Sequence, residues 1–369
     1  MENIDDKQLD VSTFGCTNCG ADLKYKPGTS HLICDYCNAD NEIPQIDTAI
    51  EELDFHEFLD NKTKSEETIT AQFVQCSSCG ASSTLDTNVS SSFCPYCSTP
   101  LIVAEAHDES IIQPKSLLPF KLDKNAAIEE FKKWINSLWF VPNDLKKAAL
   151  NFDHFKGIYI PYWSYDTDTH TQYIGQRGIH YYVNESYTTT ENGKTVTKTR
   201  SVRKTRWYSA SGSVQKLFDD LLVAATRSVP EKYIYKLEPW DLENLTAFDK
   251  KYLSGFVTEK YQIELIEGFD IAKQLADPEI RNVIRRDIGG DEQRILNMNT
   301  SYNNITFKHL LLPIYVSAYK YKEKLFQFLV NGRTGEVQGQ RPYSWIKIAA
   351  AVIGAVTVIG VIIYFAQQG

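Results

Sequence analysis

The eight cysteines are the residues best suited to chemistry, because all of them lie before residue 98 and the other 272 of the 369 residues contain none. They form two sets with the same spacing, C-x2-C-x14-C-x2-C, and the second set repeats the first at an offset of 60 residues. Gly-Ala follows the first pair of each set. In chain order the sets are Cys16, Cys19, Cys34 and Cys37, then Cys76, Cys79, Cys94 and Cys97.

This spacing is typical of zinc ribbons. Two residues between cysteines let one tight turn direct two thiolates, at about 2.3 Å, toward one tetrahedral Zn²⁺. The 14-residue spacer is long enough for a β-hairpin that returns the second turn to face the first. We therefore predict two Zn²⁺ ions, each ligated by one set of four cysteines. Iron and a disulfide framework are the alternatives, but the acidic, polar N-terminus without a signal-peptide pattern favours a metal in a reducing compartment.

The predicted metal sites are structural rather than catalytic. Four thiolates saturate each ion, so no coordination position stays open for water or substrate. Each ribbon has few apolar residues with which to form a core. Metal binding must therefore supply much of the free energy of folding.

Charge is unevenly distributed along the chain. Residues 1–104 hold 17 Asp and Glu against 5 Lys and Arg, a balance of −12, whereas the remainder holds 30 against 34. Repulsion from phosphates argues against nucleic-acid binding by the ribbons. The acidic stretch 50–60 (IEELDFHEFLD) predicts a solvated linker helix, with a docking peptide for a basic partner as the alternative.

The middle of the chain predicts a mixed α+β body. The hydrophobic fraction of 43% and charged fraction of 23% are those of a folded protein. Helical periodicity predicts an amphipathic helix over 125–138 and two or three helical stretches over 261–295, broken near Pro278 and Gly289. Aromatic and β-branched runs predict strands over 158–165, 170–183, 310–321 and 325–331.

A β-hairpin carries the densest basic patch. Asn192-Gly193 predicts a type I′ turn between strands 181–190 and 195–207, in a register that places Glu185 opposite Arg200 and Glu191 opposite Lys194. Anionic lipids, nucleic acid, the protein's own acidic ribbons and a solvated edge strand are competing interpretations of its cations. These cations are Lys194, Lys198, Arg200, Arg203, Lys204 and Arg206.

The C-terminal stretch predicts a transmembrane helix over 345–366. Residues 348–365 contain no charge, and Trp345 and Tyr364 lie near the two ends of a segment about 31 Å long as a helix. A buried core helix would show a polar face, which this segment lacks. Basic residues precede the span, so the positive-inside rule predicts a tail-anchored protein with its bulk in the cytoplasm.

No catalytic constellation is apparent. The seven histidines include no pair at metal-binding spacing, and no nucleophile elbow or phosphate-binding loop is present. We therefore predict a protein that is not an enzyme. An enzyme with an unrecognised site is the alternative.

Several motifs together carry a family resemblance. They are the two CxxCGA…CxYC ribbons, Leu118-Pro-Phe120, Ile160-Pro-Tyr-Trp163, the stretch 312–319 (LPIYVSAY), the stretch 328–335 (FLVNGRTG) and Arg341-Pro-Tyr-Ser-Trp345. This set resembles bacterial membrane-anchored, TFIIB-type double zinc-ribbon proteins. Members are often labelled primosomal protein N′ or helicase-like, but this chain lacks a Walker A loop and is too short for two motor domains. The resemblance implies a protein partner similar to phage-shock protein A or SPFH membrane proteins.

The combined prediction is an α+β, cytoplasm-facing membrane adaptor that binds a protein partner and acts in membrane stress. Nucleic-acid binding in replication or transcription is the alternative function. The predicted organisation is a first ribbon (1–48), an acidic linker (49–70), a second ribbon (71–104), a body (105–344) with the basic hairpin (181–207), and the membrane helix (345–366).

Overall fold

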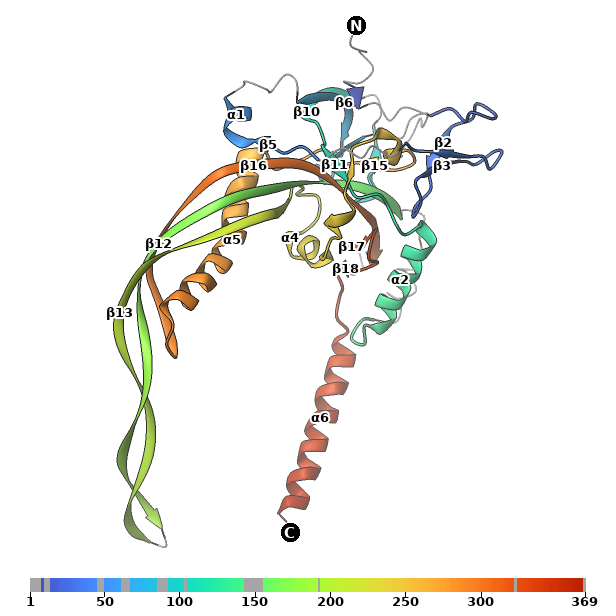
Figure 1. Ribbon diagram of the computed structural model, residues 1–369. Coiled ribbons are helices and arrows are strands. Elements are labelled where there is room, and N and C mark those ends of the chain that lie inside the picture. Colours follow the sequence, from blue (N-terminus) through green and yellow to red (C-terminus); the bar gives the residue numbers. More distant parts are fainter. Residues whose placement is uncertain are drawn as a thin grey trace.

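The computed structural model describes residues 8–9, 14–44, 50–60, 67–84, 92–102, 105–142, 155–191, 193–321 and 324–367. They form a mixed α+β structure with two N-terminal four-cysteine groups and an apolar C-terminal helix (Figure 1). The fold class predicted from the sequence is confirmed at this level.

A nine-stranded sheet forms the centre of the body. Its three long strands are antiparallel in the order β13 (Lys194–Ala224), β12 (Lys156–Glu191) and β16 (Glu292–Tyr321). β17 (Lys324–Asn331) and β18 (Val337–Gly339) extend it beyond β16, while β11 (Ser116–Leu117), β14 (Thr246–Ala247) and β15 (Val257–Thr258) complete its base. Figure 1 shows the long strands leaving the body as a curved projection, here called the arm (residues 167–218 and 292–303).

The strands are longer than predicted. The stretches 158–165 and 170–183 belong to one strand, because the polar residues between them form a β-bulge where the register shifts and not a loop. β16 begins at Glu292, although only 310–321 was predicted. The hairpin register is confirmed, with Glu185 opposite Arg200 and Glu191 opposite Lys194. Asn192 of the predicted turn lies outside the described residues.

Two longer helices cover the sheet. α2 (Lys124–Ser137) confirms the amphipathic prediction, and its Phe131 ring stacks on Phe328 at 3.7 Å between centroids. α5 (Leu265–Ile288) lies along the concave side of the arm (Figure 1). The predicted break at Pro278 is wrong, because Ala276, Ile280, Ile284 and Ile288 continue one buried stripe through it. The short helical turns α4 (Glu231–Ile234), η3 (Tyr235–Leu237), η4 (Leu242–Asn244) and η5 (Lys250–Leu253) join these elements.

The N-terminal region contains two small cysteine modules. The first cysteine module (residues 14–44) is a three-stranded sheet of β2 (Leu23–Tyr25), β3 (His31–Cys34) and β4 (Asp40–Glu42), which confirms the hairpin predicted for its spacer. The second cysteine module (residues 67–102) contains β6 (Thr68–Gln75), β7 (Ser82–Thr84), β8 (Ser92–Phe93) and β9 (Pro100–Leu101). β6 also pairs with β1 (Gln8–Leu9) and with β10 (His107–Ile112), which leads into the body.

The acidic stretch between the modules is not a solvated linker. β5 (Leu53–Asp54) pairs with β16, and α1 (Phe55–Leu59) buries Phe55 and Phe58 against Phe307 of the body. The solvated state predicted for this stretch is therefore wrong, whereas the predicted helix is present over Phe55–Leu59, and the docking peptide for a basic partner stays a prediction. The apolar side chains that could have docked a partner are already covered by the chain's own sheet.

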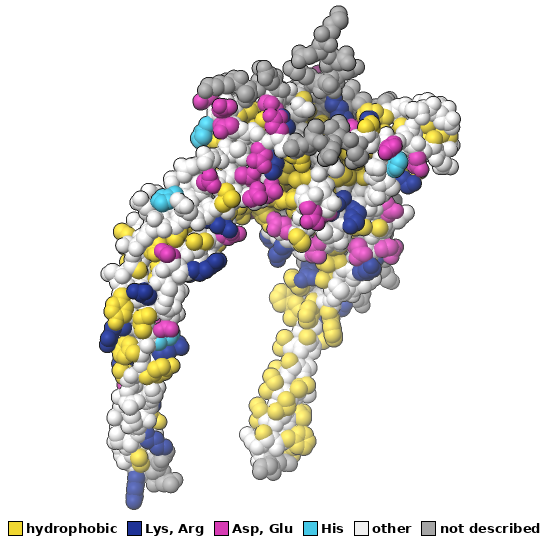
Figure 2. Space-filling model, in the orientation of Figure 1, with side chains coloured by type: hydrophobic (Ala, Val, Ile, Leu, Met, Phe, Trp, Pro, Cys, Tyr) yellow, Lys and Arg dark blue, Asp and Glu magenta, His cyan; other side chains and the backbone are white. Residues whose placement is uncertain are grey.

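The C-terminal helix α6 (Trp345–Ala366) is long and apolar enough to cross a membrane, and none of its residues is buried. Figure 2 shows its apolar surface projecting from the body. The body holds the start of this helix, because the Ser344 N–H donates to the Phe140 carbonyl at 2.7 Å and Lys347 Nζ donates to Val141 at 2.9 Å.

Candidate metal centres and the junctions around them

The eight predicted cysteines form two compact groups. In each group the four Sγ atoms all lie within 4.8 Å of one another. Cys16 and Cys37 are 3.6 Å apart and Cys19 and Cys34 are 3.4 Å apart. The equivalent pairs of the second group, Cys76 with Cys97 and Cys79 with Cys94, are both 3.5 Å apart.

Nearly identical backbone turns hold the thiols. In the first module the Gly20 N–H donates to the Cys16 carbonyl at 2.8 Å, and in the second the Gly80 N–H donates to the Cys76 carbonyl at the same distance. Both glycines have φ of 77°, a left-handed conformation that side-chain-bearing residues rarely adopt. The repeated Gly in the sequence is therefore required by the turn that directs the thiols.

The sulfur atoms fit a tetrahedral metal ion. Four Sγ atoms at about 2.3 Å from one ion lie about 3.8 Å from each other, close to the distances found here. The thiolate is the form that binds metal. A hydrogen bond with the Asn18 side chain lowers the pKa of Cys37 to about 6. The contact between Cys79 and Cys94 lowers the pKa of Cys79 to about 5 and raises that of Cys94, so the fit to a metal rests on the positions of the sulfur atoms. Each group could therefore hold a metal ion.

The second module is joined to the body through Tyr96, which lies between two of its cysteines. The Tyr96 side chain is fully buried, and its hydroxyl donates to Glu259 Oε2 at 2.6 Å. Glu259 also accepts hydrogen bonds from Thr226 and Ser228, while its burial raises its pKa to about 7. The turn that carries Cys94 and Cys97 is thus part of the core of the body.

The equivalent residue of the first module points to solvent. Tyr36 occupies the same place between Cys34 and Cys37, yet its side chain is 84% exposed. The two repeats have similar sequences at this point, but their tyrosines have opposite environments. Local sequence could not have distinguished them, because burial of Tyr96 depends on contacts with residues more than 100 positions away.

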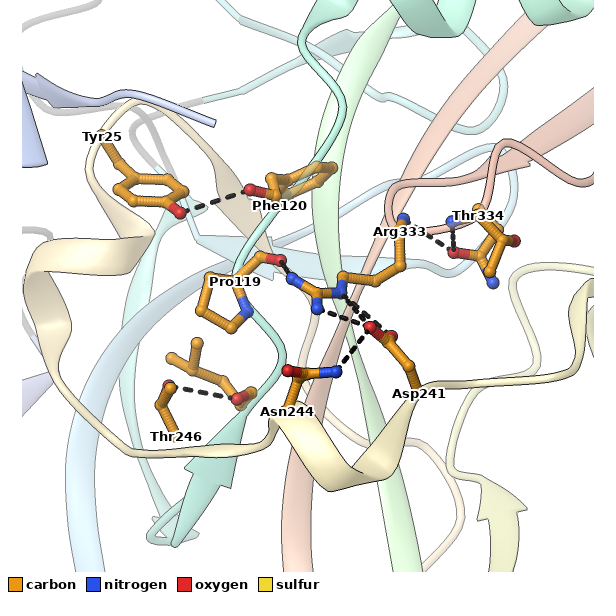
Figure 3. A network of polar contacts seen from close by, with 10 residues as sticks. Tyr25, Pro119, Phe120, Asp241, Asn244, Thr246, Arg333 and Thr334 are labelled. Carbon is orange, nitrogen blue, oxygen red and sulfur yellow. Dashed lines mark hydrogen bonds and ion pairs between the residues drawn. The ribbon is translucent and has the colours of Figure 1, made fainter. Parts of the chain in front are cut away.

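The first module contacts the body at the segment Leu118-Pro119-Phe120 (Figure 3). The Tyr25 hydroxyl donates to the Phe120 carbonyl at 3.2 Å, and Arg333 Nη1 donates to the Pro119 carbonyl at 3.0 Å. Arg333 Nε also donates to both carboxylate oxygens of Asp241, at 3.0 and 3.1 Å. Two of the motifs noted in the sequence therefore stabilise the junction between module and body.

Both modules contact a single segment of the body, residues 252–262. The Tyr25 N–H of the first module donates to the Ser254 carbonyl at 3.0 Å. For the second module, the Lys260 N–H donates to the Ser82 carbonyl at 3.0 Å. Glu259, which binds Tyr96, lies in the same segment.

A buried ion cluster lies where the arm leaves the body. Lys308 Nζ is 2.9 Å from Glu52 and 2.9 Å from Asp220, and its residue is 8% exposed. Burial raises the pKa of the nearby Asp166 to about 7. Carboxylate oxygens of Asp166, Asp219 and Asp220 also lie within 4.8 Å of one another, but Lys308 supplies the positive charge and we assign no metal there.

His309, which the sequence did not single out, is a buried neutral imidazole. Its residue is 2% exposed, its Nδ1 lies 2.7 Å from the Ile112 carbonyl, and its ring packs against Trp163. Burial lowers its pKa to about 4. Because the Nδ1 contact is with a carbonyl oxygen, the N–H of the neutral ring is at Nδ1.

We expect His309 to make the protein acid-sensitive. The unfolded chain takes up this proton near pH 6.5 and the folded chain near pH 4, so stability falls as the pH drops between these values, by up to about 3 kcal/mol. His309→Asn keeps a donor near the Ile112 carbonyl but cannot titrate. Denaturant unfolding of the full-length protein in detergent, from pH 7 to 4, should show a shallower loss in this variant. Parallel curves would contradict the assignment.

The comparisons with known proteins give a relative of undefined function. No protein-family model matches the chain, and no solved structure matches it. A Bacillus subtilis (strain 168) protein named "Uncharacterized protein YdjG" is 27% identical over 241 residues, which are 65% of this chain and 67% of that protein. This likeness assigns no activity.

Proposed function

We propose that the protein is a membrane-anchored adaptor, in which two structural zinc ribbons of the TFIIB type and the body present a docking surface to a protein partner. The opposite environments of Tyr36 and Tyr96 carry the proposal. One ribbon uses its tyrosine to dock on the body, and the other leaves the equivalent tyrosine available. Exposed tyrosines in rigid settings are frequent binding hot spots.

Zn²⁺ is the metal that we propose for both sites. Four cysteine thiolates are the ligand set of structural zinc, and neither group includes a histidine or carboxylate. The ion would fix the turn that carries Tyr36 and so give the tyrosine a rigid base. We propose no enzymatic activity for these sites, since four thiolates complete the coordination of the ion.

The cytoplasmic face of a membrane is the location that we propose for the modules. The basic residues that precede α6 support this orientation through the positive-inside rule. By the family resemblance, a protein similar to phage-shock protein A or an SPFH protein is the proposed partner. Asp35 and Asp40, near Tyr36 in the sequence, pair with Lys24 and Lys26 of the same module at 2.6 and 3.7 Å, so they do not define the charge of the partner.

Replacing Tyr36 by alanine should weaken partner binding by about 30-fold, because truncating a hot-spot aromatic costs about 2 kcal/mol or more of binding free energy. The measurement is cross-linked pull-down of the full-length protein from native membranes. Tyr182→Ala is the matched control, since Tyr182 is also exposed, at 69%, but lies on the arm. Metal content and membrane retention should match the wild type. Undiminished capture by Tyr36→Ala would place the docking surface elsewhere.

Nucleic-acid binding is the second candidate function. The arm interleaves tyrosine with arginine, with Arg200 5.6 Å from the Tyr187 ring centroid and Arg206 5.0 Å from that of Tyr181. Aromatic and cationic side chains together can bind bases and phosphates. The cross-linking experiment described below separates this function from lipid binding.

A further inference from the structure

Exposed aromatic residues surround the start of α6. Trp345 is 81% exposed, Tyr343 56% and Trp139 77%, and hydrogen bonds join the 140–141 segment to Ser344 and Lys347. Aromatic side chains collect at the level of the lipid headgroups. If α6 crosses the membrane as proposed, this aromatic collar (Trp139, Phe140, Tyr343 and Trp345) marks the membrane surface.

The arm extends past that level. Figure 1 shows the arm and α6 leaving the body in the same general direction, with the far end of the arm as low as the C-terminal end of α6. β16 pairs with β12 only as far as Gly178, so residues 179–206, here called the arm tip, form a two-stranded ribbon. Neither edge of this ribbon pairs with another described strand.

The two faces of the arm tip differ in chemistry. Residues opposite each other in an antiparallel pair share a face, and alternate residues along a strand do too. One face, here called the cationic face, carries all five even-numbered cations between 194 and 206 together with the half-exposed Ile179, Tyr181, Tyr187 and Val196. Glu185 is its one carboxylate among the side chains that the structure describes.

The opposite face of the outer tip is neutral. The pairs Ser186 with Thr199 and Thr188 with Thr197 cover it with hydroxyl groups, and Tyr182 with Arg203 lies closer to the body. Solubility alone does not require cationic side chains on one face of the ribbon and neutral hydroxyl side chains on the other. Figure 2 shows cations and apolar side chains interleaved along the arm.

The arm tip cannot insert into the hydrocarbon core of the bilayer beside α6. Two open strand edges would leave backbone N–H and C=O groups without partners, and charged side chains are costly there. At the membrane interface the open strand edges of the arm tip can form hydrogen bonds with lipid headgroups and water. Its aromatic and aliphatic side chains can enter the boundary between headgroups and acyl chains. If α6 crosses the membrane, the arm must therefore turn relative to α6, away from the direction drawn in Figure 1, until it lies along the membrane surface.

We propose that the cationic face of the arm tip binds the anionic surface of the bilayer that α6 crosses. The proposal rests on the membrane span of the proposed function, but not on the partner or on Tyr36. Cations on this face meet anionic headgroups, and Tyr181 and Tyr187 lie among them at the level where tyrosine is favoured. The arm would be a second, lipid-selective contact in addition to the anchor.

Photo-cross-linking of the full-length protein tests this proposal. The cross-linker p-benzoylphenylalanine is placed singly at position 187 on the cationic face, 188 on the opposite face, or 139 in the aromatic collar. Each protein is reconstituted in bilayers of phosphatidylcholine alone or of phosphatidylcholine and phosphatidylglycerol in equal parts. The cross-linker at position 187 should form lipid adducts only in bilayers that contain phosphatidylglycerol. At position 188 it should form few adducts in either bilayer, and at position 139 it should form adducts in both.

Charge variants complete the test. Lys194→Glu with Lys198→Glu should reduce the adduct at position 187 by about tenfold, because each basic residue near an anionic surface contributes to binding. Thr197→Glu with Thr199→Glu adds charge to the opposite face of the same strand and should reduce it much less. Lipid adducts at 139 without any at 187, or equal adducts at 187 and 188, would overturn the proposal while leaving the anchor intact. Adducts of position 187 with nucleic acid in cells would overturn it in favour of the second candidate function.

Discussion

Cys94→Ser should lose one metal ion per chain and destabilise the whole body, by about 5 kcal/mol or more. The neighbouring Tyr96 is fully buried and binds Glu259, so a disordered turn would remove an aromatic side chain from the core as well as the metal. Loss of a buried aromatic side chain alone costs about 3–5 kcal/mol, and the free energy of metal binding adds to it. Metal analysis and denaturant unfolding of the full-length protein in detergent measure both effects.

Three control variants separate the effect of losing the metal from the effect of losing the buried tyrosine. Ser78→Ala lies in the other cysteine turn of the same module, between Cys76 and Cys79, and supplies no thiol, so it should keep both ions. Tyr96→Phe keeps the ring and removes the hydroxyl, so this variant should keep both ions. Its free energy of unfolding should fall by about 1–3 kcal/mol, because Glu259 loses a hydrogen-bond donor. Cys34→Ser should lose one ion with a smaller effect on the body, because Tyr36 is not part of the core. If Cys94→Ser kept two ions, the assignment of the second centre would be wrong.

Lys308→Met should destabilise the protein by about 3 kcal/mol at neutral pH. Removing the cation leaves Glu52, Asp166 and Asp220 close together without their countercharge, and breaking a buried ion pair from one side typically costs about 3–5 kcal/mol. We expect the lower end of this energy range, because the side chains of Glu52 and Asp220 are 34% and 29% exposed. Denaturant unfolding of the full-length protein measures the loss.

The pH dependence identifies the cause. The pKa of Asp166 is already raised to about 7, so its ionised form is disfavoured in the folded state, and the contribution of Asp166 to stability falls as the pH rises from about 4 toward 7, opposite in sign to that of His309. The defect of Lys308→Met should therefore shrink at pH 5, and Asp220→Asn should partly restore the variant. Lys216→Met, which breaks a partly exposed pair with Glu279, should cost less than about 1 kcal/mol. A defect independent of pH would point to lost packing instead of charge.

The sequence predicted those features that depend on neighbouring residues. The cysteine turns need two thiols and a glycine within five positions, and the arm turn fixed the register of the whole hairpin from Asn192-Gly193. The amphipathic stripe of α2 and the apolar run of α6 were likewise visible as local patterns.

Features that depend on distant residues could not be predicted. Phe55 and Phe58 appear in an acidic stretch, and only their packing against Phe307 makes them core residues. Asp166 interrupts an apolar pattern, but it accepts a hydrogen bond from the Asp220 N–H at 2.6 Å and so the strand continues through a bulge. Pro278 usually ends a helix, yet packing on both sides of it against the arm maintains α5.

The segment 252–262 touches both cysteine modules, and this shared contact links the two proposed metal equilibria. Whichever ion binds first would order Ser254, Glu259 and Lys260 against its own module. The second module would then meet a surface whose conformational entropy has already been lost, so its ion would bind more tightly. Linkage requires the effect to be mutual. At limiting metal, chains with two ions would therefore be more frequent than two independent sites would give, and loading of the protein would respond to metal supply more steeply than either site alone.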